Sequence, residues 1–319
     1  MALHFTVLAS GSSGNASLVR SNGFGLLLDI GLGPRELAAR LKAIGASWAD
    51  VHAAILTHTH TDHWNDRTLA YLRKMRLPLY CHAEHHEALL AGGRAFAALV
   101  ADNLVRNYQP ETETEFTPGL RCRALPIRHD GGATFGFRLE ATAGTFGATA
   151  ALAYAADLGT WTAELAEAFA DVDALALEFN HDVGMQYASG RSPLLIHRVL
   201  GDDGHLSNDQ AAALLGEILR RSAPGRLRHV IQLHLSRDCN RPALAQQTAQ
   251  AIIGDVVEIT IHTASQHQPG PSLSLPAGSV PAKRRRSSTA RVGVNGADHP
   301  CLPGMEPTET PANPSSSAG

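Results

Sequence analysis

The 319-residue sequence has a hydrophobic fraction of 44% and a formal net charge of −3, so it can bury a core, and its overall charge predicts neither a nucleic acid nor an anionic membrane as partner. No stretch approaches the ~18 consecutive apolar residues of a membrane span. The four cysteines form no C-x-x-C pair and the N-terminus lacks the pattern of a secretory signal, which together predict a cytoplasmic protein with free thiols.

Strand-like and helix-like segments alternate over residues 1–264. The expected strands, in chain order, are residues 4–10, 17–21, 24–30, 52–57, 77–81, 120–127, 134–140, 149–156, 173–179, 229–235 and 256–262. The expected helices are PRELAARLKAIG, WNDRTLAYLRKM, TAELAEAFA, NDQAAALLGEILRRS and PALAQQTAQAII. Strands that first dominate and then alternate with helices predict an α/β fold with two sheets, or one folded sheet, and with helices on the outside.

The composition changes near residue 265. From Ser265 to Gly319 the sequence is rich in Pro, Ser, Gly and Thr, lacks periodic apolar residues and contains the basic run KRRR at 283–286. Such a segment cannot bury enough apolar surface to offset its ordering entropy. We therefore expect one domain over residues 1–264 and a disordered low-complexity tail over residues 265–319. The basic run could contact nucleic acid, although a solvated tail is the simpler explanation.

Four of the predicted strands are followed by side chains that can bind a metal ion. The strand at 52–57 leads into HTHTDH at 58–63, which crowds three histidines and a carboxylate into six residues. Three later strands lead to His129, Asp157 and His234. Because loops at the carboxyl ends of strands in α/β proteins project into a common crevice, we expect these seven side chains to converge.

The seven side chains divide into two sets that share one carboxylate. His58 and His60, two residues apart, can point to one side of an extended segment and share an ion. The expected sets are His58, His60 and His129 for one ion, Asp62, His63 and His234 for the other, and Asp157 as the bridge. Nitrogen and oxygen ligands without thiolate suit Zn²⁺, Mn²⁺ or Fe²⁺. Such a set leaves room for a hydroxide, which is typical of a catalytic site rather than a closed structural one.

The motif H-x-H-x-D-H at 58–63, followed in order by His129, Asp157 and His234, resembles the metallo-β-lactamase fold superfamily of hydrolases over residues 1–264. The resemblance implies a four-layer αββα sandwich with a dinuclear metal site at one edge, held by the same two sets and bridge. LASGSSGNASLV, LLLDIGLG, EFNHD, GHLSNDQAA and LHLSRDCN are similar to the YycJ/WalJ group of that superfamily. This similarity implies a phosphodiesterase or exonuclease that acts on DNA.

The segment GHLSNDQAA also suggests how a phosphate could be bound. Ser207 or Asn208 is expected to cap a helix whose free N–H groups and positive dipole end would receive a phosphate. His205, just before it, could donate a proton or a hydrogen bond, although an ordinary cap beside a packed histidine would have the same sequence. Asn180 and His181 follow a predicted strand and are candidate substrate contacts.

The sequence thus predicts a metal-dependent hydrolase in which a hydroxide between two divalent cations attacks the substrate and Asp62 or Asp157 relays protons. Zn²⁺ and Mn²⁺ are the first expectation for the metals. The first expectation for the substrate is a phosphodiester, DNA above all, and a membrane is not expected as a partner. One alternative is a hydrolase of small esters, thioesters, lactones or cyclic phosphodiesters, because one scaffold hosts many chemistries. A remoter alternative is a non-enzymatic protein in which the metal ions only stabilise the fold.

Local charge bears on the choice between these substrates. Residues 265–319 carry five Lys or Arg and three Asp or Glu, so the remaining chain is more acidic than the whole. A DNA-binding groove would therefore need local basicity, for which Arg191, Arg198, Arg237 and Arg241 are the candidates. A second histidine-rich segment, with His82, His85 and His86, is expected to hold surface or packing histidines.

Overall fold

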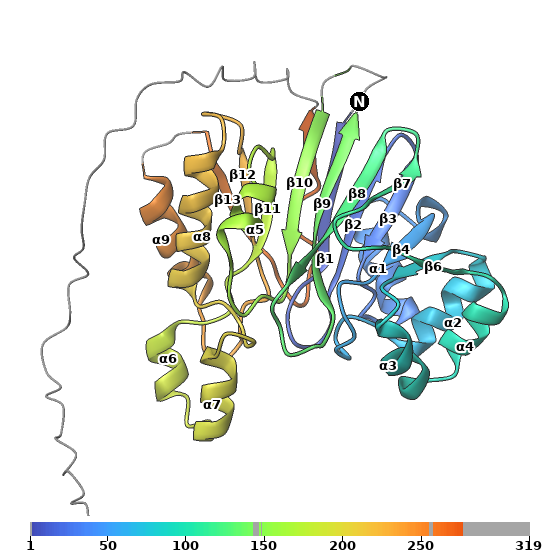
Figure 1. Cartoon of the computed structure of the whole chain (residues 1–319), viewed down its shortest axis with the longest axis horizontal. Helices are drawn as coiled ribbons and strands as arrows, with labels where there is room; N and C mark the ends of the chain where they lie inside the picture. The colour runs from blue at the N-terminus through green and yellow to red at the C-terminus, as the bar shows by residue number, and fades with distance from the viewer. Residues whose placement is uncertain (1, 143–146, 148, 255–257, 277–319) are drawn as a thin grey trace, which may run out of the picture. The chain divides into compact units, whose positions relative to one another are not determined.

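A computed structural model of the chain (Figure 1) describes residues 2–142, 147, 149–254 and 258–276, which belong to one compact unit. The first sheet has the strand order β14 (Leu273–Pro276), β1 (Ala2–Ala9), β2 (Ala16–Ser21), β3 (Phe24–Leu28), β4 (Ala53–Ile55), β5 (Leu79–Cys81), β6 (Val105–Asn107). The second has the order β13 (Thr260–Thr263), β12 (His229–Leu233), β11 (Ala174–Glu178), β10 (Thr149–Ala155), β9 (Thr134–Thr142), β8 (Leu120–Ile127), β7 (Glu113–Thr117).

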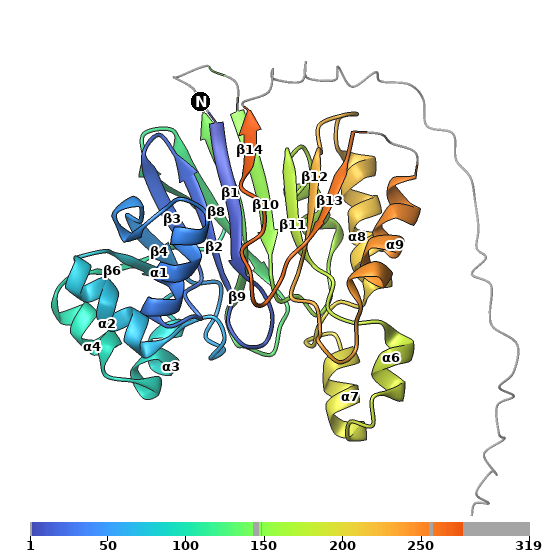
Figure 2. The same cartoon turned by 180° about the vertical axis from the view of Figure 1, so that it is seen from behind.

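Helices cover the outer face of each sheet, as Figures 1 and 2 show from opposite sides. The helices on the first sheet are α1 (Pro34–Ala43), α2 (Asp66–Met75), α3 (His85–Gly92) and α4 (Ala95–Ala101), with a short 3₁₀ turn at Trp48–Asp50. Those on the second sheet are α5 (Ala163–Ala168), α8 (Asn208–Arg221) and α9 (Pro242–Ile253). Two further helices, α6 (Val183–Ala188) and α7 (Pro193–Leu200), lie beyond the end of the second sheet (Figure 1).

The alternation of side chains along the strands builds three apolar layers. In β3, Leu26 and Leu28 belong to the core between the two sheets, whereas Leu27 packs with Leu37 of α1 and Leu69 of α2. In β11, the alanines at 174 and 176 face the inner core, and the leucines at 175 and 177 pack under the helices of the second sheet. Strands covered on both faces are apolar at nearly every position, which is why these runs stand out in the sequence. The four-layer αββα sandwich is confirmed.

Parallel pairing in both sheets brings the functional loops to one end of the sandwich. Strands β3 to β6 run parallel, as do β10 to β13, while the remaining pairs are antiparallel. In the second sheet Glu178 at the end of β11 is in register with Leu233 at the end of β12. The loops that follow β4, β10, β11 and β12 therefore start from the same end of the sandwich.

The sequence-based boundary of the domain needs a correction. Residues 265–276, predicted as part of a disordered tail, are described, and β14 pairs with β1 in the register Leu275↔Leu3. Leu273 and Leu275 enter the core between the sheets. Four residues among prolines and serines are too few to give a strand pattern, which is why the segment escaped prediction. The rest of the predicted tail, residues 277–319, lies outside the described residues.

The predicted strands and helices all overlap observed ones. Besides β14 and the 3₁₀ turn, six described elements were not predicted. β6 and β7 are short and half exposed, α3 and α4 carry little amphipathic pattern, and α6 and α7 contain only six and eight residues. Within the described part of the chain, no helix is both long and apolar enough to cross a lipid bilayer.

Candidate metal centre

The HTHTDH loop after β4 is held in place by backbone contacts with the first sheet. The N–H of Asn15 donates to the carbonyl of Asp62 (2.7 Å), and the N–H of Ile30 donates to the carbonyl of His63 (2.9 Å). Gly31 packs so closely against this loop that a Cβ atom on it would lie 1.8 Å from the carbonyl oxygen of Asp62. Asn65 then caps α2 by accepting a hydrogen bond from the N–H of residue 67. The second half of the motif is therefore held between the first sheet and the start of α2.

The structure brings all seven predicted metal-binding side chains together in two groups. In each group the candidate donor atoms lie within 4.8 Å of one another. The groups are His58, His60, His129 and Asp157, and Asp62, His63, His234 and Asp157. They coincide with the two sets proposed from the sequence, including the shared carboxylate.

Asp157, at the end of β10, lies between the two groups. Its Oδ2 atom is 3.4 Å from His58 Nε2, 3.2 Å from His63 Nε2 and 3.6 Å from His129 Nε2. Donor atoms around one tetrahedral Zn²⁺ are separated by roughly 3.3 Å, because Zn–N and Zn–O bonds are about 2.0–2.1 Å long. The observed spacing thus fits a shared metal ligand.

Hydrogen bonds on the Nδ1 side orient three of the imidazoles. His63 Nδ1 donates to Asp29 Oδ2 (2.8 Å), His129 Nδ1 donates to the carbonyl of Gly204 (2.8 Å), and His58 Nδ1 is hydrogen-bonded to the hydroxyl of Thr57 (2.9 Å). Partners of this kind fix both the tautomer and the direction of a metal-binding ring. The opposite nitrogen, Nε2, then faces the cluster in each case.

Buried atoms without partners show that the cluster suits a cation. His58 Nε2 and His234 Nε2 are buried and have no hydrogen-bond partner among the described residues. Leaving a buried polar atom unpaired costs about 1–3 kcal/mol, so such atoms call for a ligand. Neutral imidazole nitrogens and carboxylate oxygens aimed at one space are the donor set of a divalent metal ion.

The charges at the site point the same way. Burial, followed by the neighbouring His63, lowers the pKa of His58 to about 3, so His58 is neutral near pH 7, the form that binds a metal. Burial alone would lower the pKa of His63, but the carboxylates of Asp157 and Asp29 raise it to about 10, so His63 holds a proton that a metal ion at the same place would displace. Burial would likewise raise the pKa of Asp62, yet the imidazole of His234, whose Nε2 lies 3.6 Å from Asp62 Oδ2, helps to lower it to about 2. The carboxylates thus stay ionised and attract positive charge to the centre.

His234 adopts a strained backbone that two side chains stabilise. Its φ of 53° is in the left-handed region, which is uncommon for a residue other than glycine. Its N–H donates to Ser10 Oγ (2.8 Å), and its carbonyl accepts a hydrogen bond from Asn180 Nδ2 (2.8 Å). Asn180, predicted as a substrate contact, therefore has its amide engaged in positioning His234.

A residue that the sequence analysis did not select, Glu178, joins the centre from the end of β11. Its Oε1 accepts hydrogen bonds from His205 Nδ1 (2.8 Å) and His234 Nδ1 (2.9 Å). Its Oε2 accepts from the N–H groups of Leu158 (3.0 Å) and Leu206 (3.1 Å). Asp157, Glu178, His205 and His234 form a third group of candidate donors. The signal in the sequence was Glu178 itself, an acid that follows the apolar residues ALAL in the run DALALEF.

The predicted phosphate-binding role of the α8 N-terminus needs a correction. Ser207 is the N-cap, and a capping box uses its N–H, its hydroxyl and the N–H of Gln210. The N–H of Asn208 donates to the carbonyl of His181 (2.8 Å), and the Asn208 side chain pairs with the amide of Asn240. Because these donors have partners inside the protein, Ser207 and Asn208 stabilise the helix start rather than present free N–H groups.

His181 and His205 differ in their access to the centre. The His205 side chain is partly exposed, and its ring centroid lies 4.9 Å from that of His129 and 5.2 Å from that of His234. His181 is fully buried, and neither of its ring nitrogens has a hydrogen-bond partner among the described residues. Burial lowers the pKa of His181 to about 4. In this conformation His205 can meet a substrate and His181 cannot.

Of the four arginines proposed to supply local basicity, Arg198 pairs with an acid that adjoins one of the metal-ligand groups. Arg198 Nε donates to Asp130 Oδ2, beside His129. Arg191 pairs with Asp238 (3.2 Å), Arg237 points into solvent with 87% of its side chain exposed, and Arg241 donates to the backbone at the start of α9. The four arginines thus differ in their surroundings.

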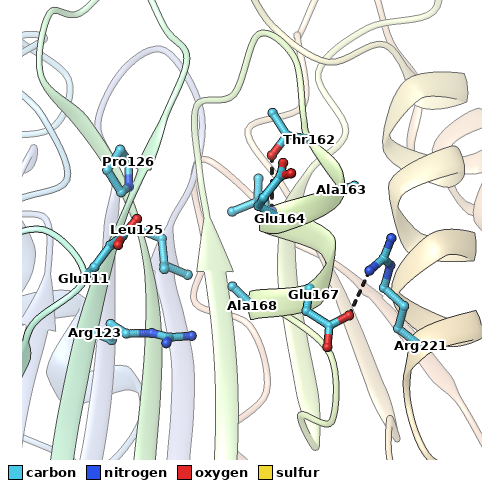
Figure 3. A pocket seen from close by; sticks show the side chains of 11 residues that line it. Glu111, Arg123, Leu125, Pro126, Thr162, Ala163, Glu164, Glu167, Ala168 and Arg221 are labelled. Carbon is cyan, nitrogen blue, oxygen red and sulfur yellow. Dashed lines mark hydrogen bonds and ion pairs between the residues drawn. The ribbon is translucent and has the colours of Figure 1, made fainter.

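The structure also contains a large cavity away from the histidines of the two metal-ligand groups. It has a volume of about 770 Å³ and lies on the outer face of β8, beside α5 (Figure 3). Arg123 and the carboxylates of Glu111, Glu164 and Glu167 line it together with apolar residues, and Glu167 pairs with Arg221 (2.8 Å). None of the residues of the two metal-ligand groups lines this cavity. Its size alone does not make it the reactive site.

Comparisons with known proteins agree with this geometry. The family described as Beta-lactamase superfamily domain matches residues 26–226. Exodeoxyribonuclease YycJ of Bacillus anthracis is 28% identical over 262 residues, which cover 79% of this chain and 90% of that protein. Exodeoxyribonuclease WalJ of Streptococcus pneumoniae serotype 2 is 26% identical over 266 residues, covering 82% and 94%. The crystal structure of the metallo-β-lactamase fold protein YhfI from Bacillus subtilis superposes with a TM-score of 0.59 at 16% identity, covering 85% of this chain and 99% of that one, which shows a common fold.

Proposed function

The chain belongs to the β-lactamase superfamily, and from that premise we propose that it is a phosphodiesterase that cleaves DNA with the help of two divalent metal ions. The observation that carries the proposal is the pair of four-residue groups that share Asp157. The names of two relatives, both exodeoxyribonucleases, favour a DNA substrate over a small ester.

We assign the metal ligands as follows. One ion would be held by His58, His60, His129 and Asp157, and the other by Asp62, His63, His234 and Asp157. Zn²⁺ or Mn²⁺ suits these nitrogen and oxygen donors best, and Fe²⁺ suits them as well. Ions bound there would polarise a phosphoryl oxygen and lower the pKa of bound water towards neutrality.

The protein's own side chains supply the remaining steps. His205 is placed to give a proton from its Nε2 atom to the departing oxygen, because its Nδ1 is held by Glu178. Burial alone would lower the pKa of His205, but the carboxylate of Glu178 raises it above its ordinary value, which favours the protonated form that a proton donor needs. Asp62, which is partly exposed beside His234, can accept a proton from the attacking water.

A ligand substitution with a matched control tests the proposal. Replacing His60 by Ala should lower the metal content of the purified protein, measured by elemental analysis, and reduce hydrolysis of bis-p-nitrophenyl phosphate by at least about 100-fold. His262→Ala removes a half-buried histidine on β13, outside both ligand groups, and should change neither quantity.

The substrate class is tested on the same preparations. A labelled DNA strand should be cleaved by the wild-type protein and by His262→Ala, and a carboxylic ester should not. Unchanged metal content and hydrolysis in His60→Ala would refute the assignment of the ligands. Turnover of the carboxylic ester without cleavage of DNA would replace the proposed substrate with the small-ester alternative.

A further inference from the structure

Asp130 connects helix α7 to one of the metal-ligand groups. Its Oδ2 atom accepts a hydrogen bond from Arg198 Nε on α7. Its other oxygen, Oδ1, lies 3.5 Å from His60 Nε2 and 3.4 Å from His129 Nε2. One carboxylate therefore reaches from the ligand group to the guanidinium of Arg198. This holds the arginine beside that ligand group, where its side chain is 60% exposed.

Arg198 keeps most of its hydrogen-bonding capacity. Asp130 occupies its Nε, and within the described residues no hydrogen bond or ion pair uses its two terminal nitrogens. Arg128 and Arg191 differ in that respect. The two terminal nitrogens of Arg128 pair with Asp202 and Asp203. Those of Arg191 contact Gln186 and Asp238.

The two terminal nitrogens of Arg198 are suited to bind a phosphate. A guanidinium is planar, always charged and able to donate two parallel hydrogen bonds to a phosphate. An arginine whose Nε is already held by a carboxylate loses less side-chain entropy when it binds. The chain from Val183 to Leu200, which includes α6 and α7, contains no Asp or Glu, so no acid within this segment competes with a phosphate.

We propose that Arg198, oriented by Asp130, binds a second phosphate of the substrate, next to the one that is cleaved. This inference rests on the proposed function and narrows its substrate class. The centre would favour a nucleic acid strand, which offers neighbouring phosphates, over a diester with a single phosphate. Arg198 is then a substrate-binding residue and Asp130 the residue that positions it.

The test compares binding of a strand with hydrolysis of a one-phosphate substrate. Binding of a fluorescent phosphorothioate oligonucleotide is followed by anisotropy over a range of salt concentrations. Arg198→Met should weaken binding by about tenfold and make the slope of log K against log salt shallower by about 0.7, the value for one lost contact with a single strand. Hydrolysis of bis-p-nitrophenyl phosphate should stay within about twofold of wild type, since it has no second phosphate.

Two further variants sharpen the test. Arg198→Lys keeps the charge but not the paired donors, so it should retain the salt slope and recover only part of the affinity. Arg73→Met is the matched control. Arg73 also pairs with an acid through its Nε, with Asp102 (2.8 Å), but it lies in the last turn of α2, at the opposite end of that helix from the HTHTDH loop. It should leave binding and hydrolysis unchanged.

The outcomes separate this inference from the proposed function. Unchanged affinity and salt slope in Arg198→Met would overturn the inference, whatever the hydrolytic activity. An equal loss of bis-p-nitrophenyl phosphate hydrolysis would overturn it too, because Arg198 would then act on the cleaved phosphate. A third outcome is that Arg198→Met binds the strand more weakly while the wild-type protein does not hydrolyse bis-p-nitrophenyl phosphate. That result would support the phosphate subsite and refute the proposed function.

Discussion

His85 is a buried imidazole with a structural task. Its Nε2 donates to the carbonyl of Ala133 (2.8 Å), and its Nδ1 accepts from the N–H of His82 (3.3 Å). The rings of Tyr108 and Phe135 surround it. Burial lowers the pKa of His85 to about 4. The sequence-based expectation of a packing histidine agrees with this position, and the contact with Ala133 ties α3 to the loop that follows His129.

A pH dependence of stability follows from this lowered pKa. Between about pH 6.5 and about pH 4 the unfolded chain binds a proton at His85 that the folded protein excludes, so the free energy of unfolding falls as the pH falls through this window. When the pH falls from about 7 to about 5, the free energy of unfolding of the wild-type protein should decrease by about 2 kcal/mol more than that of His85→Gln. Urea unfolding of both proteins at the two pH values measures this difference.

The neighbouring histidine provides the control for this measurement. His86 is half-buried on the same helix and hydrogen-bonded to Asn107 (2.8 Å). His86→Gln should keep the pH dependence of the wild-type protein. Parallel pH curves for wild type and His85→Gln would mean that His85 is not kept neutral by the fold.

At the scale of elements, the sequence predicted two features best: the buried strands and the side chains that can bind metal ions. The central strands were visible because they are apolar at nearly every position, and the seven donors were visible because they follow four of the predicted strands. β14 was missed because only Leu273 and Leu275 mark it. Glu178 was missed because its function depends on the parallel register of β11 and β12, which no local pattern encodes. The contact between Asp130 and Arg198 joins residues 68 positions apart and was equally invisible.

The contribution of β14 can be measured within the strand itself. Leu275 is buried in the core between the sheets, so Leu275→Ala should lower the free energy of unfolding by about 2–4 kcal/mol. Ser274 is exposed on the same strand, and Ser274→Ala should change it by less than about 0.5 kcal/mol. Equal unfolding midpoints for the two variants in urea would show that the first sheet does not need this strand.

At the scale of the whole molecule, the candidate metal centre spans both sheets. His58, His60, Asp62 and His63 follow a strand of the first sheet, whereas His129, Asp157 and His234 follow strands of the second. Each of the two ligand groups contains residues from both sides. Bound cations would therefore hold the two halves of the sandwich together at this end.

Metal removal should consequently change stability as well as activity. At a free metal concentration of about 100 times Kd, binding stabilises the folded state by about 2.7 kcal/mol, so chelation should lower Tm by about 5–10 °C while the far-ultraviolet circular dichroism spectrum is retained. Adding Zn²⁺ or Mn²⁺ back should restore both Tm and hydrolysis.

Asp157→Asn gives the complementary measurement, because both groups lose their shared carboxylate. Its Tm should no longer respond to chelator or added metal. Loss of the circular dichroism spectrum on chelation would favour the alternative in which metals only staple the protein. A wild-type Tm that ignores both chelator and metal would contradict a metal site altogether.

The position of α6 and α7 in the chain has an evolutionary consequence. The segment leaves the sandwich after β11 and returns just before α8. Glu178 is anchored by β11 and accepts hydrogen bonds from the N–H groups of Leu158 and Leu206, whereas the N–H of His205 donates to the carbonyl of Val199 in α7 (3.0 Å). The connection between α6 and α7 can therefore change in length without moving Glu178, while α7 has to keep its place beside His205. Related chains can vary their substrate preference through this connection and inherit the reactive groups unchanged.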